Sequence, residues 1–153
     1  GQFHRIILSC RHGDCQSGTF AFRMNPRPME QSPSIKTDAA FRYGLFGVGR
    51  CGCVHGEILI AQGQRVVAIG DENPNAISNA ITHLGLQEAV PFLDAASMAR
   101  SGIIDAAVIA SHTKDHARHA EPFIRAGIPV YLETPLTSAL SEGFSFVKTL
   151  GLA

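Results

Sequence analysis

The sequence predicts an α/β domain in which one parallel sheet is covered by helices on both faces. From Phe41 onward, short apolar runs alternate with helix-like segments, and a glycine-rich turn follows the first apolar run. This alternation is typical of parallel sheets, because the crossover helices bury both faces of the sheet. Right-handed crossovers place the carboxyl ends of the strands along one edge, where a ligand crevice forms.

Hydrophobic periodicity sets the order of the elements. Strands are expected at 43–48, 65–70, 105–111 and 128–132, with a weaker one at 90–92. Helices are expected at 50–62, 74–84, 94–101, 115–126 and 137–149. Asn73 and Thr137 are expected to cap two of these helices, and Pro74 suits a first helical turn. Gly127 predicts the end of the fourth helix.

Composition describes a single globular domain. The chain has 153 residues, of which 45% are hydrophobic and 17% charged, which is enough apolar material for a core. Thirteen basic residues balance thirteen acidic ones, so charge gives no indication of a nucleic-acid or membrane partner. No apolar run approaches the roughly eighteen residues that a membrane helix needs.

Residues 1–40 differ from the domain at 41–153. They hold scattered arginines, serines and prolines without periodicity, and we expect a poorly ordered extension. An arginine-rich, acid-poor start also suits an organellar transit peptide. The alternative is a translated leader with the true start at Met24 or Met29, which the lack of an amphipathic helix favours.

The four cysteines are Cys10, Cys15, Cys51 and Cys53, and none of their spacings is a CxxC. On a helix, side chains two residues apart diverge, so Cys51 and Cys53 predict free thiols rather than a disulfide or a zinc site. Free thiols suit a reducing compartment, and we expect a cytoplasmic protein.

The glycine-rich turn has the parts of a dinucleotide clamp. It reads Gly47-Val48-Gly49-Arg50-Cys51-Gly52 and opens the first expected helix, and Asp71 ends the next strand. Gly47 permits a tight turn, Gly49 lets the backbone approach a pyrophosphate, and Gly52 lets the helix press against the strand. Asp71 is placed to accept hydrogen bonds from the adenosine ribose. The sheet is therefore predicted to be a Rossmann-type doubly wound sheet.

The cofactor is expected to be NAD rather than NADP. A 2′-phosphate would meet the carboxylate of Asp71, and the next residues, Glu72 and Asn73, bring no compensating arginine. Ser111 to Asp115 and Glu133 to Pro135 follow other strand ends and should line the same crevice. Because a buried carboxylate is costly without partners, Glu133 is expected to meet the nicotinamide ribose or a backbone donor.

Three stretches in series resemble the N-terminal domain of the Gfo/Idh/MocA oxidoreductases. They are Gly47 through His55, Asp105 through His116, and Ala126 through Leu136, within a likeness that covers about 42–150. The sequence from Tyr43 to His55 is most similar to that of inositol 2-dehydrogenase-like members. The resemblance implies NAD(P)-dependent hydride transfer on a sugar, inositol or related polyol. The expected cofactor-binding residues are Gly47, Val48, Gly49, Arg50, Cys51, Gly52, Asp71, Ser111, His112, His116, Glu133 and Thr134.

The chain departs from the family pattern in two ways. Thr134 stands where the family's Glu-Lys-Pro motif has a lysine, which the resemblance places near the reacting hydroxyl. His112 is a candidate for proton transfer in its place, although a solvated loop histidine is the more ordinary interpretation. The family's C-terminal substrate domain is missing. The chain is then either a fragment of an oxidoreductase or a non-catalytic NAD-sensing or interaction module, and an uncovered face leaves self-association open.

Other polar residues are weaker candidates. His55, one turn into the first helix, either touches the cofactor or the facing loop, or packs as an ordinary helix histidine. His116 and His119 share a helix face at a spacing that metals use, but no third ligand accompanies them, so no metal is expected. The absence of a GxSxG elbow argues against a serine hydrolase at Ser111.

Overall fold

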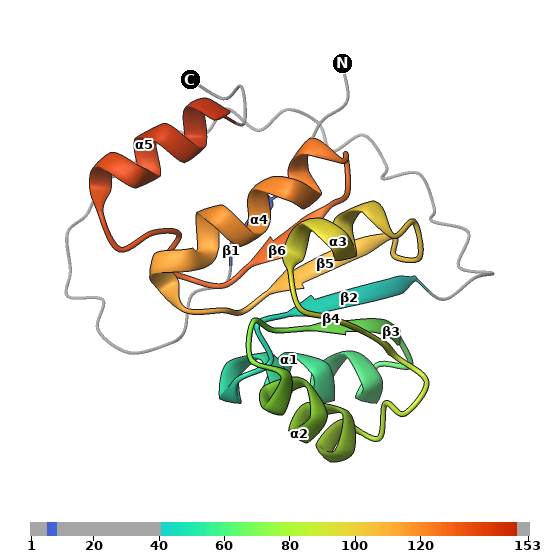
Figure 1. Cartoon of the computed structure of the whole chain (residues 1–153). Coiled ribbons are helices and arrows are strands. Elements are labelled where there is room, and N and C mark those ends of the chain that lie inside the picture. Colours follow the sequence, from blue (N-terminus) through green and yellow to red (C-terminus); the bar gives the residue numbers. More distant parts are fainter. Residues whose placement is uncertain (1–5, 9–40, 150–153) are drawn as a thin grey trace, which may run out of the picture.

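We describe the fold from a computed structural model in which residues 6–8 and 41–149 are placed (Figure 1). Most of the interval 1–40, expected to be a poorly ordered extension, lies outside these residues. Within it, however, the structure contains a strand that the sequence analysis did not predict, β1 (Ile6–Leu8). This strand pairs in parallel with the strand that ends at Leu132.

The described strands form one parallel six-stranded sheet in the order β1-β6-β5-β2-β3-β4. The central strands are β2 (Arg42–Phe46) and β5 (Ala106–Ile109). The others are β3 (Arg65–Gly70), β4 (Val90–Phe92) and β6 (Val130–Leu132). The chain moves outward from β2 to β4, returns to β5, and then builds the other side. The topology therefore reverses between β2 and β5, which is where such sheets bind ligands.

Helices cover both faces of the sheet (Figure 1). On one face lie α1 (Arg50–Ala61) and α2 (Pro74–Leu84). On the other lie α3 (Ala95–Arg100), α4 (His116–Arg125) and α5 (Leu140–Thr149). No helix in the described part of the chain is both long and apolar enough to cross a membrane.

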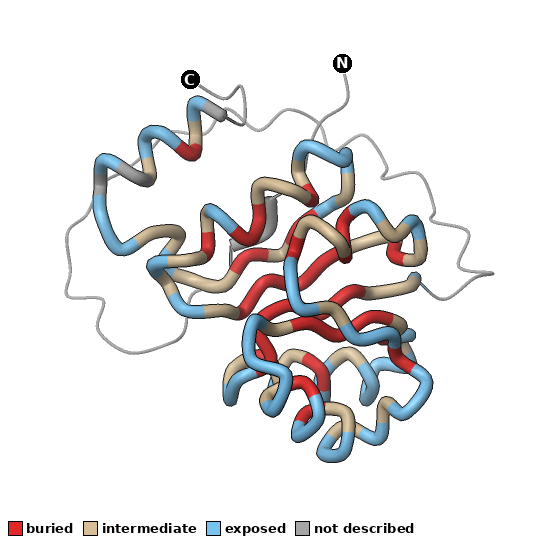
Figure 2. Tube along the Cα trace, in the orientation of Figure 1, coloured by how far each residue is buried: buried red, intermediate tan, exposed pale blue. Residues whose placement is uncertain are grey.

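Adjacent residues of the central strands enter opposite cores. Leu45, Ile69 and Val108 are buried in the cluster beneath α1 and α2. Phe46 and Ile109 belong to the cluster beneath the other three helices. Figure 2 shows the buried residues concentrated along the strands and the inner helix faces. The nearly continuous apolar strands thus contribute side chains to the cores on both faces, as expected for a sheet covered by helices on both sides.

Two of the three expected helix boundaries are confirmed. Asn73 caps α2 by accepting a hydrogen bond from the Asn75 amide at 3.0 Å. Gly127 follows α4 with φ at +73°, a left-handed conformation that ends the helix. The cap expected at Thr137 is wrong. Helix α5 begins at Leu140, and the Thr137 hydroxyl instead donates to the Ala139 carbonyl at 2.9 Å.

The strand expected at 105–111 ends earlier, at Ile109, and the helix expected at 115–126 starts as a short 3₁₀ turn, η1 (Thr113–Asp115). Ser111 and His112 therefore belong to a loop at the carboxyl edge of the sheet. This loop brings polar side chains toward the turn after β2.

Candidate cofactor-binding site

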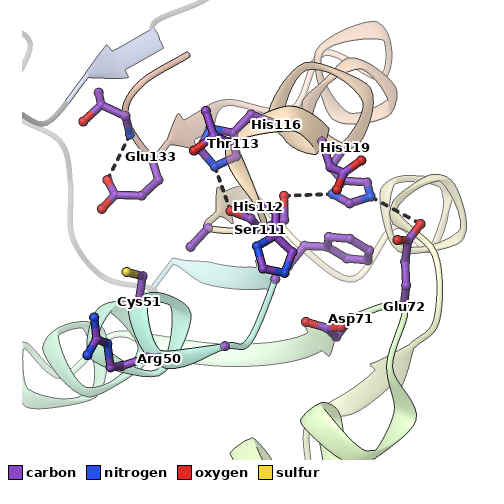
Figure 3. Close-up of a pocket in the computed structure, with 16 residues that line it drawn as sticks. Arg50, Cys51, Asp71, Glu72, Ser111, His112, Thr113, His116, His119 and Glu133 are labelled. Atoms are coloured by element: carbon purple, nitrogen blue, oxygen red, sulfur yellow. Dashed lines mark hydrogen bonds and ion pairs between the residues drawn. The ribbon is translucent and has the colours of Figure 1, made fainter. Parts of the chain in front are cut away.

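A cavity of about 500 Å³ lies at the carboxyl ends of β2, β3, β5 and β6 (Figure 3). Its walls come from four separate strand–helix connections, which only the parallel topology brings together. The lining residues are Phe46, Gly47, Gly49, Arg50, Cys51, Asp71, Glu72, Ala110, Ser111, His112, Thr113, Asp115, His116, His119, Glu133 and Thr134.

The glycine turn is shaped by close backbone contacts. Gly47 has φ at +87°, and a Cβ there would strike the Ser111 backbone. Its amide donates to the Gly70 carbonyl at 2.8 Å, which holds the turn against β3. A Cβ on Gly52 would strike the Gly47 carbonyl oxygen. Gly49, in contrast, has no heavy atom of the other described residues within 4 Å of its Cβ position, its chain neighbours and its own helix backbone aside. The open space lies where a pyrophosphate needs to approach the backbone.

Helix α1 points its amino end at this cavity. Gly49 is its N-cap residue and accepts the first helical hydrogen bond, from the Cys53 amide at 2.9 Å. The amides ahead of Cys53 have no acceptor within the helix, and the helix dipole adds positive potential there. No acidic residue occupies the first turn of α1 to neutralise that potential. The arrangement is suited to bind a phosphate group.

Asp71 is held in place by two backbone amides. Its Oδ2 accepts from the Val48 amide at 3.0 Å, and its Oδ1 accepts from the Asn73 amide at 2.9 Å. Val48 belongs to the glycine turn, so the carboxylate and the turn are connected directly. Each carboxylate oxygen can accept further hydrogen bonds, which leaves capacity for the hydroxyls of a ribose.

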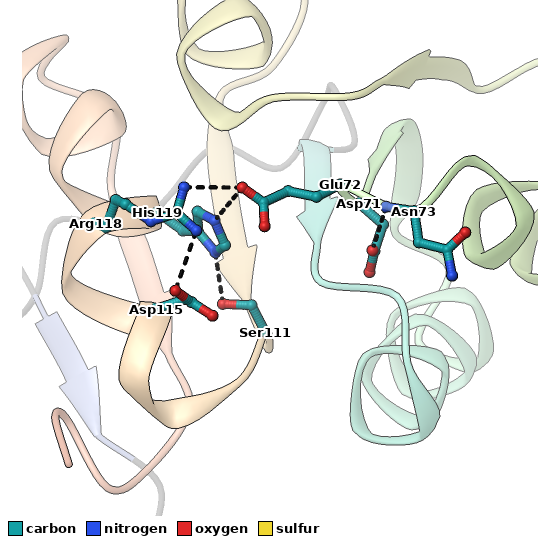
Figure 4. Close-up of polar contacts among 7 residues, drawn as sticks. All are labelled: Asp71, Glu72, Asn73, Ser111, Asp115, Arg118 and His119. Carbon is teal, nitrogen blue, oxygen red and sulfur yellow. Dashed lines mark hydrogen bonds and ion pairs between the residues drawn. The ribbon is translucent and has the colours of Figure 1, made fainter.

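A polar cluster links the connection after β3 with α4 (Figure 4). Arg118 donates to Glu72 at 2.8 Å and to Asp115 at 3.1 Å. The hydrogen bond from Arg118 lowers the pKa of Glu72, and both carboxylates raise the pKa of Arg118. The tertiary structure thus brings an arginine next to Glu72, which the local sequence did not suggest. That arginine is already shared between two carboxylates.

His119 lies behind this cluster, almost fully buried. Its Nδ1 is 2.8 Å from the Ser111 hydroxyl. Its Nε2 is 3.5 Å from Oε1 of Glu72 and has no hydrogen-bond partner among the described residues. Burial is the main reason that the pKa of His119 is lowered, which favours the neutral ring. His119 and His116 both face the sheet, and no group of three or more metal-ligating side chains occurs in the described part of the chain.

The other end of the cavity carries Glu133 and Thr134. An oxygen of the Glu133 carboxylate accepts from the Thr134 amide at 3.2 Å, and the other oxygen is 3.6 Å from Nε2 of His55. The His55 ring also packs against Tyr131, with ring centroids 5.2 Å apart. His55 therefore contacts the connection after β6, one of the two alternatives that its position in the sequence left open. Glu133 has a backbone donor, as expected for a partly buried carboxylate.

Most of the predicted cofactor residues lie together at this cavity. Val48 and Gly52 do not line it. Val48 is buried and contributes its amide to Asp71, while Gly52 allows α1 to pass the Gly47 carbonyl. His112 is exposed on the rim, and Cys51 and Cys53 are free thiols, as predicted.

Sequence reasoning did not assign Phe46, Glu72, Ala110 and His119 to the cavity. Three of them immediately flank residues that were predicted, so their positions at strand ends carried the signal. His119 is different. It lies one helical turn beyond His116, and only the fold shows that this turn faces Ser111.

The fold and the site together define a dinucleotide-binding Rossmann domain. A parallel sheet with this reversal point, a glycine turn opening a helix, and a carboxylate after the next strand are the features of that class. Residues 41–151 match the oxidoreductase family with an NAD-binding Rossmann fold, Gfo/Idh/MocA. The chain belongs to this family, as its resemblance predicted.

Curated relatives agree with this assignment, and a solved structure shares the fold. The chain is 36% identical over 96 residues to inositol 2-dehydrogenase of Rhizobium meliloti, covering 62% of this chain and 28% of that protein. It is 32% identical over 116 residues to inositol 2-dehydrogenase of Acidothermus cellulolyticus, covering 74% and 33% respectively. Lactobacillus casei myo-inositol dehydrogenase, solved with NAD(H) and myo-inositol, superimposes with a TM-score of 0.68 at 23% identity, covering 72% of this chain and 33% of that one. The chain spans about a third of the length of these relatives.

The cavity fits an NAD molecule. The open space at Gly49 and the amino end of α1 would receive the pyrophosphate, and Asp71 would receive the adenosine ribose. Glu133 lies across the cavity from Asp71 (Figure 3), and the nicotinamide half would extend toward Glu133 and the adjacent Thr134.

Proposed function

We propose that this chain is the cofactor-holding part of an oxidoreductase that transfers hydride between NAD and an inositol or related polyol. The observation that carries the proposal is the juxtaposition of the glycine turn, Asp71 and the Glu133–Thr134 connection around one cavity. The two inositol 2-dehydrogenase relatives support the substrate class.

Different residues act at the two ends of the cavity. The α1 amides and Asp71 bind and orient the cofactor, which when bound supplies the hydride-accepting ring. Glu133, which accepts from the Thr134 amide and lies beside His55, orients the connection that faces the ring. We propose NAD rather than NADP, because a 2′-phosphate at Asp71 would also approach Glu72, and Arg118 is committed to two carboxylates.

Two measurements test this function. Fluorescence titration of the chain with NADH should show saturable binding, and NADPH should bind at least tenfold more weakly. Turnover with myo-inositol should appear when the chain is joined to the part of the R. meliloti relative that it does not cover. Failure to bind either coenzyme in a folded sample would reject the proposal at its first step.

A second candidate is an NAD-sensing or interaction module without catalysis. Thr134 favours it, because a neutral side chain at the position of the family's lysine cannot stabilise developing negative charge as a cation does. Thr134→Lys in the joined protein separates the candidates. A rate increase of about tenfold or more supports an oxidoreductase limited by the missing cation. NADH binding with no turnover in either protein supports the sensing module.

A further inference from the structure

His116 occupies an unusual position at the back of the cofactor cavity. It is the first residue of α4, and only 1% of it is exposed. Its Nε2 is 2.9 Å from the Ser111 carbonyl oxygen (Figure 3), and its Nδ1 is 2.9 Å from the Pro135 carbonyl oxygen. One ring therefore connects the loop after β5 with the connection after β6.

A carbonyl oxygen only accepts hydrogen bonds, so both ring nitrogens of His116 face acceptors. A neutral imidazole has one N–H and one lone pair. It would satisfy one carbonyl and point its lone pair at the other from 2.9 Å. Only the doubly protonated ring donates to both. We propose that His116 is an imidazolium that joins the two loops, and is thereby a positioning residue for the cofactor site.

The joined loops carry the residues that set the width of the cavity. Ser111 lies opposite the glycine turn, where its backbone leaves no room for a Cβ on Gly47. Pro135 directly follows Thr134, whose backbone amide holds Glu133. Loss of one of the two His116 hydrogen bonds would release Ser111 or the Glu133–Thr134 connection. The cofactor contacts two separate connections, so both must be held at the correct spacing.

The surrounding charges act in both directions. The amino end of α4 disfavours a cation at its first residue, because the helix dipole is positive there. The carbonyl dipoles of Ser111 and Pro135 favour it. The described titratable side chains on the elements that pack around His116 are Arg100, Lys114, Asp115, Arg118, His119, Glu121, Arg125, Tyr131, Glu133 and Lys148. None of them forms a hydrogen bond to His116 among the described contacts.

The decisive measurement is nitrogen NMR of the histidine rings in the chain without cofactor. At pH about 7.5, roughly one unit above the usual titration point of histidine, one ring should keep protons on both nitrogens. That signal should disappear in His116→Gln and persist in His83→Gln, a surface variant at the Glu57 pair. A neutral His116 ring, with one bare nitrogen at that pH, would overturn the proposal.

NADH binding tests the positioning role. We expect His116→Gln to weaken NADH binding about tenfold, equivalent to 1.4 kcal/mol, because glutamine offers a single NH₂ group in place of two separate ring nitrogens. Binding to the parent should weaken as the pH rises and the second proton is lost, and this dependence should be absent from His116→Gln. His83→Gln should bind as the parent does. A His116→Gln variant with the parent's affinity and pH profile would refute the positioning role. Because the NMR measurement needs no cofactor, it decides the protonation state even if NADH does not bind. If His116→Gln does not fold, the ring signal is assigned from the parent's own backbone resonances.

Discussion

Replacing Gly52 with alanine tests how the glycine turn is built. Gly52 is buried in the first turn of α1, and an added Cβ would strike the carbonyl oxygen of Gly47. The obstacle is backbone, so it cannot move aside as a flexible side chain would. Gly47 is itself fixed by its hydrogen bond to Gly70 and by the Ser111 backbone opposite.

The expected cost follows from two opposing effects. Alanine is favoured over glycine inside a helix by about 1 kcal/mol. Overpacking commonly costs about 1–3 kcal/mol, and more where the neighbour cannot yield. We therefore expect Gly52→Ala to lower the free energy of unfolding by about 2 kcal/mol. The displaced turn should also weaken NADH binding at least tenfold.

Urea unfolding followed by circular dichroism, together with NADH titration by fluorescence, measures both effects. Gly49→Ala is the matched control, because its Cβ position is open among the described residues that surround it. It should lower the free energy of unfolding by about 1 kcal/mol, the typical cost of alanine at an N-cap. It should nevertheless weaken NADH binding, since the methyl group fills the space for the pyrophosphate. The reasoning fails if Gly52→Ala is as stable as the parent, or if Gly49→Ala binds NADH unchanged.

Three further predictions concern named side chains. Asp71→Asn should weaken NADH binding about tenfold in calorimetry, because the NH₂ group of the asparagine would face the backbone amide donor of Val48 or Asn73. Unchanged affinity would exclude Asp71 from the ribose site. Hydrogen bonds from Arg42 lower the pKa of Asp105 from 3.8 to about 2. The stabilisation of the fold by this ion pair is therefore present above pH 3.8 and is lost as the pH falls toward 2. Asp105→Asn should lose less stability than the parent over that pH range. Acid titrations monitored by circular dichroism would contradict this if both proteins lost the same stability. Burial, and secondarily the charge of Glu57, raises the pKa of Cys53. Mass mapping should therefore show slower alkylation of Cys53 at neutral pH in the folded chain than in the urea-unfolded chain. Equal rates of alkylation would count against this prediction.

The elements of the domain were readable from the sequence because their signals are local. The run at 65–70 and the segment at 74–84 have the predicted bounds, since the first is apolar from Val66 onward and the second begins at an Asn-Pro cap. Thr137 carried the same local signal, but α5 begins three residues later and its hydroxyl bonds elsewhere. Packing decides at which residue a helix begins, and the residue types near that position do not reveal it.

The edge strand β1 shows the same limit more strongly. Its three residues have no periodicity to distinguish them within their surroundings. Pairing with β6 makes them a strand, and that partner lies more than a hundred residues away in the chain. Long-range pairing of this kind leaves no pattern within the short segment itself.

The sequence by itself determined the sheet class, the glycine turn and the carboxylate at position 71, because each depends on residue types within one strand–turn–helix unit. Only the tertiary structure decided which distant groups meet. It brought Arg118 to Glu72, placed His119 against Ser111, and set the His116 ring between two carbonyl oxygens. These contacts join connections after different strands, and their geometry exists only when the parallel sheet places those strand ends side by side.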